Sequence, residues 1–112
     1  MLPQVTFRGL SPSSSIVDVV FRKAKKLGVI APQLEGCHVV IEVSGRGSQR
    51  RQEYRVSVHL SGGTIAARRS TRHATNDNVY VALRDVFEAT RRQLETRGVR
   101  SRGQQAPLEV LH

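Results

Sequence analysis

The sequence predicts an α+β fold, a two-layer sandwich in which two helices cover one face of a four-stranded sheet. Three observations predict it. The spacing of apolar residues changes along the 112 residues in the order strand, helix, three strands, helix. Short polar turns separate the last three strands, which favours an antiparallel meander. Each helix has a single apolar stripe, so both helices can cover the same face of the sheet.

The first two elements are a short strand and an amphipathic helix. Residues 3–9 alternate between apolar and polar side chains, and Gly9 closes this strand. A serine within residues 11–15 is a good N-cap for the helix that follows, and Gly28 is a good residue to end it. The apolar residues of this helix recur at helical spacing and are Ile16, Val17, Val20, Phe21, Ala24 and Leu27.

Three further strands are expected in the middle of the chain. Cys37–Ser44 is rich in β-branched residues, as in a central strand. Tyr54–Leu60 alternates strictly, and Ser61–Gly63 is a hairpin signal because glycine supplies the positive φ of a tight turn. Thr64–Arg72 continues as the last strand. The side chains of the middle strand that face inward are Tyr54, Val56, Val58 and Leu60, while Arg55, Ser57 and His59 face outward.

A second helix and a tail complete the chain. His73–Asn78 is expected to be a polar link that ends in cap-type residues, and Gly98 is expected to end the helix. The predicted domain therefore spans residues 1–97, and residues 98–112 form a flexible C-terminal tail. The inward face of the second helix consists of Val79, Leu83, Val86, Phe87, Thr90 and Leu94.

Positive charge is the strongest functional signal. The chain has 18 lysines and arginines against nine acids, a net charge of +9. The excess is clustered on the first helix, on the polar turn at residues 45–52 and on the segment that holds Arg68, Arg69 and Arg72. Clustered cations gain free energy by releasing counterions from a polyphosphate. A negatively charged partner is therefore expected, with RNA or DNA first.

Several other classes of function lack residues to support them. The four histidines are not at metal-ligand spacing from the single cysteine or from one another, and no nucleotide-binding or catalytic motif is present. No cofactor, metal, small-molecule substrate or enzymatic activity is expected. Cys37 is expected to be a buried thiol. With three Phe, two Tyr and no Trp, stacking on exposed bases is disfavoured as the main binding mode. No membrane span or signal peptide is expected, and a cytoplasmic location fits.

The order of elements, combined with three local motifs, resembles a known family. The motifs are Val5-Thr6-Phe7-Arg8-Gly9, the hairpin Leu60-Ser61-Gly62-Gly63-Thr64-Ile65, and the helix opening Asn78-Val79-Tyr80-Val81-Ala82-Leu83. Over residues 5–97 the chain is similar to the ribosome hibernation promoting factors, also called ribosome-associated inhibitor A or sigma-54 modulation proteins. The short segment after the second helix matches the short form of that family.

The resemblance implies a fold similar to the double-stranded RNA-binding domain, and a partner. Members of this family bind rRNA of the small ribosomal subunit in the channel used by mRNA and tRNA, and they silence ribosomes under stress or in stationary phase. The chain is then expected to be monomeric off the ribosome. The rRNA contacts that the resemblance implies are Arg22, Lys23, Lys25 and Lys26 on the first helix and Arg84, Arg91, Arg92 and Arg97 on the second.

Alternatives remain open for the partner and for one cluster of arginines. The chain could instead be a stand-alone nucleic-acid-binding module, or an interaction protein that docks on an acidic protein. Arg68 and Arg69, with Arg72, would serve either as an RNA contact or as protection of an edge strand against aggregation, and RNA contact is slightly favoured.

Overall fold

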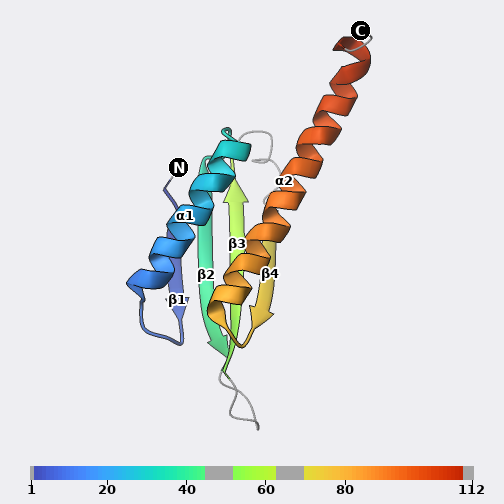
Figure 1. The fold of residues 1–112 in the computed structure, drawn as a ribbon. Helices are drawn as coiled ribbons and strands as arrows, with labels where there is room; N and C mark the ends of the chain where they lie inside the picture. Colours follow the sequence, from blue (N-terminus) through green and yellow to red (C-terminus); the bar gives the residue numbers. More distant parts are fainter. Residues whose placement is uncertain (1, 45–51, 63–69, 110–112) are drawn as a thin grey trace.

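The element order of the structure is the predicted one. The computed structural model describes residues 2–44, 52–62 and 70–109, and only the backbone of residues 44, 70, 71 and 96–109. Both helices lie on one face of a single sheet (Figure 1), so the predicted α+β sandwich is confirmed. The elements are β1 (Gln4–Arg8), α1 (Ser14–Ile30), β2 (Gly36–Ser44), β3 (Glu53–Ser61), β4 (Ser70–Asn76) and α2 (Val79–Glu109).

The four strands lie side by side in the order β1-β2-β3-β4. β1 pairs with β2 in parallel, which requires the long connection that α1 provides. The β2–β3 and β3–β4 pairs are antiparallel, as the predicted meander requires. In the centre of the sheet Val39 lies opposite Val58 and Ile41 opposite Val56. This register places these four side chains on the helical face of the sheet.

The core lies between the sheet and the two helices. Val20 of α1, Leu83 and Val86 of α2, and Ile41 and Val56 of the sheet have no exposed surface. The apolar stripes read from the sequence are therefore the buried ones, with one correction. Phe21 is 40% exposed, because it lies about 100° around α1 from Val20 and so at the margin of the stripe.

The two ends of α1 differ in how well the sequence marks them. The Ser13 hydroxyl accepts a hydrogen bond from the Ile16 amide at 3.3 Å, so a serine is the N-cap, as expected. Gly28 does not end the helix, which continues to Ile30. Ala31 is the C-cap with a non-helical φ of −131°, because the residue before Pro32 is disfavoured in the α conformation.

The last strand lies further along the chain than expected. β4 spans Ser70–Asn76, so the strand continues through residues 73–76, which were expected to belong to the link His73–Asn78. The first part of the predicted strand Thr64–Arg72, residues 64–69, lies outside the described residues. The sequence of β4 lacks the apolar alternation that predicts a strand, because β4 lies at the sheet edge and, among its described side chains, only Ala74 is an apolar residue packed against the core. The cap-type residues still act as caps: the Asn78 side chain accepts a hydrogen bond from the Tyr80 amide at 2.9 Å.

The second helix is longer than expected. Gly98 was predicted to end it, but the backbone stays helical to Glu109 and projects beyond the sheet (Figure 1). A glycine costs a helix about 1 kcal/mol relative to alanine and does not by itself stop it. The division into a domain at 1–97 and a flexible tail at 98–112 stays a prediction. Among the described residues, no helix combines the length and apolar character that a membrane crossing requires.

Cys37 is buried in the core, as expected for a structural thiol. Its residue is 3% exposed, and burial raises the pKa of the thiol to about 11. The thiolate is the reactive form of cysteine, so this side chain is chemically inert at neutral pH.

Candidate nucleic-acid interface

Four cations of α1 form a continuous band on the helix surface. At 100° per residue, Lys25, Arg22, Lys26 and Lys23 follow one another around an arc of about 160°. Arg22, Lys25 and Lys26 are exposed and Lys23 is half-buried. No acid among the residues whose side chains the structure describes forms an ion pair with any of the four. We call these residues the basic band, and none of its four cations is held in an ion pair with a described acid.

The basic band borders a groove between the two helices. This groove has a volume of about 290 Å³. Lys23 and Lys26 line it from α1, and Arg84 and Arg91 line it from α2. The helices therefore bring together four of the cations that the resemblance implied. The remaining lining residues are Leu27, Ile30, Phe87 and Glu88, so the groove has an apolar floor between charged walls.

The cations of α2 are less available than those of α1. Arg91 makes an ion pair with Glu88 and a second one with Glu95 at 2.9 Å. Arg84 pairs with Asp85 at 3.1 Å, and these close acids neutralise part of the positive charge of α2. Along residues 79–95 three arginines face three acids. Over the part of the helical layer whose side chains are described, the net positive charge is therefore concentrated on α1.

Glu88 is the acid at the centre of this arrangement. Hydrogen bonding from Arg91 holds the pKa of Glu88 below its ordinary value, and the positive charges of Arg91, Arg92 and Lys23 act in the same direction. The same hydrogen bond raises the pKa of Arg91. Arg92 lies 3.8 Å from Glu88, in the i,i+4 order expected to stabilise a helix. Glu88 thus remains ionised at neutral pH and opposes an anionic ligand in the groove.

Removing the charge of Glu88 should strengthen binding to a polyanion. Glu88→Gln is expected to tighten RNA binding about threefold, because it frees Arg91 and Arg92 from their shared acid. Electrophoretic mobility shift with a short RNA duplex at two salt concentrations would measure the change. Glu53→Gln is the matched control, because it makes the same change in net charge at the start of β3, away from the last turns of α1 (Figure 1). Equal tightening by both variants would contradict a role for the groove.

A second hollow lies on the other side of the basic band. Arg22 and Lys25 line it together with Leu2, Phe21 and Val29, and its volume is about 480 Å³. Leu2 is 81% exposed and Val29 is 76% exposed, so large apolar side chains stand beside the cations. The basic band therefore separates two hollows, of which only the one toward α2 has cations on both walls.

The other residues predicted from the sequence are not placed at this interface by the structure. Arg68 and Arg69 lie outside the described residues, as do the three arginines of the turn, Arg46, Arg50 and Arg51. Arg97 belongs to α2, but only its backbone is described. Arg72 donates a hydrogen bond from Nε to the Gln93 side chain at 2.9 Å, which connects the edge strand β4 to α2.

Sequence reasoning missed the groove itself. The sequence predicts that the first helix ends at Gly28, which leaves Ile30 outside it. Phe87 was assigned to the core, and it does lie there, 5% exposed, while it also lines the groove. The helical spacing of Lys23, Lys26 and Ile30 was a usable signal, since residues three and four apart share one face.

The described residues contain no group of three or more His, Cys, Asp or Glu side chains that could hold a metal ion. What the helical layer offers instead is a fixed pattern of positive charge with an apolar groove beside it. Cations arranged in this way can pair with the phosphate groups of a nucleic acid without reading its sequence.

The fold and the charge define a class of small basic α+β proteins, namely two-layer β-α-β-β-β-α sandwiches with cations along their helices. Residues 4–102 match the family model described as Sigma 54 modulation protein / S30EA ribosomal protein, and the chain belongs to that family. Family membership also classes the chain as a non-enzymatic factor, in agreement with the sequence.

Solved structures show the same fold. A ribosomal subunit interface protein from Coxiella burnetii superposes with a TM-score of 0.68 at 16% identity, covering 88% of this chain and 99% of that one. The N-terminal domain of Protein Y from Thermus thermophilus gives a TM-score of 0.64 at 18% identity, covering 86% of this chain and 98% of that one. No curated protein sequence matches the chain.

Proposed function

We propose that this protein is a ribosome-associated translation inhibitor. It binds rRNA of the small subunit in the channel used by mRNA and tRNA, and it silences ribosomes under stress or in stationary phase. The observation that carries the proposal is the basic band on α1, whose four cations form no ion pair among the described side chains and border the groove toward α2. The chain belongs to a family whose description includes a ribosomal protein, and this supports the ribosome as the partner.

The mechanism is occlusion. A rigid sandwich presents cations to phosphate groups, which position the protein on the RNA without reading its sequence. Bound protein then fills space that mRNA and tRNA require. This mechanism needs no cofactor and no small-molecule substrate. We further propose that the protein is cytoplasmic and is a monomer off the ribosome. Its rRNA contacts then lie within residues 1–97.

Sedimentation with ribosomes tests the proposal. Purified small subunits and whole ribosomes are pelleted with the protein across a salt series, and inhibition of cell-free translation is measured in parallel. The expected result is saturable pelleting near one copy per ribosome together with blocked translation. Binding should persist at salt concentrations that remove the protein from naked RNA duplex, because a shaped rRNA site adds contacts beyond counterion release.

Two other results would contradict the proposal. Unsaturable pelleting that vanishes at moderate salt would indicate a general nucleic-acid-binding module. A complex that survives nuclease treatment would indicate docking on an acidic protein instead.

A further inference from the structure

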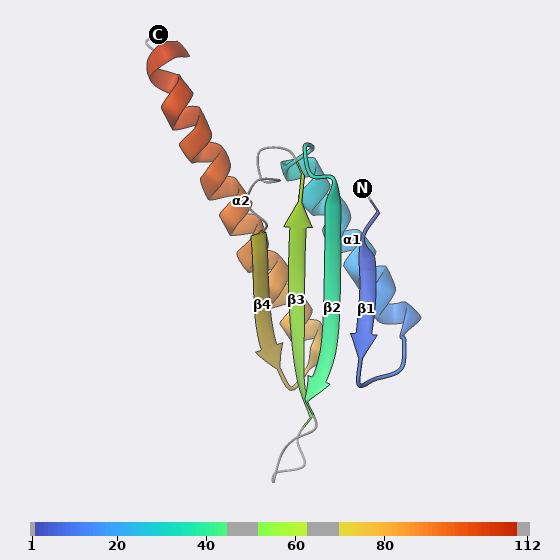
Figure 2. The same ribbon diagram turned by 180° about the vertical axis from the view of Figure 1, so that it is seen from behind.

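The face of the sheet opposite the helices is uncovered by any described element (Figure 2). Strand register arranges its side chains in three rows across β1, β2 and β3. We call these nine residues the open face. Its rows are Gln4, His38 and His59, then Thr6, Val40 and Ser57, then Arg8, Glu42 and Arg55, and His73 of β4 extends the middle row beside Ser57.

Two imidazole rings lie side by side on the central strands. His38 of β2 is directly opposite His59 of β3, and the ring centroids are 6.0 Å apart with the planes tilted by 44°. Thr6 Oγ1 is 2.8 Å from His38 Nε2, a contact that orients the His38 ring. His59 is exposed and His38 is half-buried. Paired aromatic rings on the central strands of an uncovered four-stranded sheet are the arrangement with which RNA-recognition sheets stack unpaired bases.

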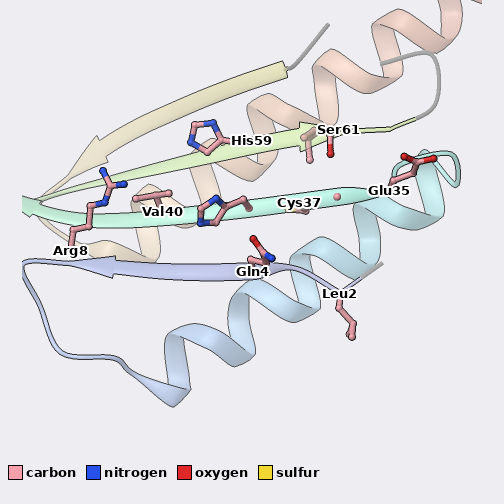
Figure 3. Close-up of a pocket in the computed structure, with 11 residues that line it drawn as sticks. Leu2, Gln4, Arg8, Glu35, Cys37, Val40, His59 and Ser61 are labelled. Carbon is pink, nitrogen blue, oxygen red and sulfur yellow. The ribbon is translucent and has the colours of Figure 1, made fainter. Parts of the chain in front are cut away.

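A hollow accompanies the two rings. Its volume is about 670 Å³, and its lining includes Gln4, Arg8, Val40 and His59 (Figure 3). Volumes of 300–1,000 Å³ are typical of small-molecule sites, so one or two nucleotides fit. Val40 is only 5% exposed although no element covers it, so the hollow has an apolar patch at its base. Ser61 and Glu35 lie at one end of the hollow and Arg8 at the other.

The charges of the open face favour an anionic ligand. Arg8 lies 3.5 Å from Glu42, and Arg55 is opposite Glu42 in the β2–β3 register. Two acids, Glu42 and Glu35, lie near the hollow. The open face and His73 beside it together contribute two arginines and three histidines. Burial lowers the pKa of His59, and the nearby His38 and Arg8 lower it further, so a positive charge on the His59 ring is disfavoured by its surroundings. A phosphate group would relieve this repulsion.

We propose that the open face binds one or two unpaired nucleotides of RNA, with their bases stacked on the His38 and His59 rings and their phosphates held by Arg8 and Arg55. This site is separate from the helical interface and goes beyond the function proposed above. Counting only Phe, Tyr and Trp hides it, because imidazole also stacks on bases and only the strand register brings the two rings together.

Binding of a short fluorescein-labelled oligouridylate, measured by fluorescence anisotropy, tests the proposal. His38→Ala/His59→Ala is expected to weaken binding at least about tenfold, because two stacking contacts are lost. His38→Phe/His59→Phe is expected to stay within about threefold of the wild type at about pH 7.5, since phenyl rings also stack. Pelleting with small subunits through the helices should remain for both variants, which separates this site from the helical interface.

The pH dependence provides a second readout. The pKa of His59 lies below its ordinary value, so wild-type binding should strengthen as the pH falls from about 7.5 to about 5.5 and the His59 ring becomes protonated. The phenylalanine variant should show a weaker pH dependence, because it lacks both groups. His73 remains in this variant and lies on the same face.

Three outcomes would overturn the proposal. The first is wild-type binding of the oligonucleotide by the alanine variant. The second is a phenylalanine variant as weak as the alanine variant, which would make charge rather than stacking the cause. The third is competition by polyglutamate as strong as that by unlabelled oligouridylate, which would indicate an acidic protein as the ligand.

Discussion

Replacing Lys25, Lys26 and Arg92 with glutamate is expected to abolish binding to the small ribosomal subunit and to leave the fold intact. The three substitutions change the net charge from +9 by six units, to +3. Lys25 and Lys26 belong to the basic band, and the Arg92 side chain is 73% exposed. Exposed substitutions of this kind usually change the free energy of unfolding by less than about 0.5 kcal/mol.

The loss in affinity should be large because three attractive contacts become repulsive. A decrease of at least about 100-fold is expected at low salt, and the dependence of log K on log salt should flatten by about three units. Co-sedimentation across a salt series measures both quantities, and circular dichroism checks the fold. Lys25→Arg, Lys26→Arg and Arg92→Lys together form the matched control, which conserves charge and should still bind. Binding of the glutamate variant at wild-type strength would show that the helical interface is wrong.

Replacing Gly62 with alanine is expected to cause the largest loss of stability among single substitutions that add one carbon atom. The φ of Gly62 is +117°, a conformation that residues with a side chain rarely adopt. A Cβ atom there would lie 2.2 Å from the backbone nitrogen of Glu35. That nitrogen donates to the Ser61 carbonyl at 2.9 Å, so relieving the overlap would break the hydrogen bond that joins the start of β2 to the end of β3.

Backbone strain and the lost contact together should lower the free energy of unfolding by about 3 kcal/mol. Urea unfolding followed by circular dichroism measures the change. Gly28→Ala is the matched control, because its Cβ would meet nothing within 4 Å and Gly28 lies inside α1. That control should be more stable than the wild type by about 0.5–1 kcal/mol. A Gly62→Ala protein that unfolds at the wild-type urea concentration would contradict the argument.

Sequence reasoning succeeded where a pattern is local and repeated. The stripe that contains Val20 and Ala24 predicted the buried face of α1, and the alternation around Val56 and Val58 predicted the buried face of β3. It failed at element ends. Gly28 and Gly98 were both taken as helix ends, yet glycine is only a weak breaker and Pro32 ends α1. The continuation of β4 through residues 73–76 is not predicted, because an edge strand with polar side chains has almost no apolar signal.

For the candidate interface, too, some features follow from the sequence and others only from the tertiary structure. The sequence by itself determined the basic band, the net charge and the order of elements, because these depend on composition and on periods of two and 3.6 residues. Only the tertiary structure decided the rest, because it depends on distances between residues far apart in the chain. The crossing of α1 and α2 forms the groove between Lys26 and Arg84. The β2–β3 register, set by burial of one sheet face, brings His38 beside His59.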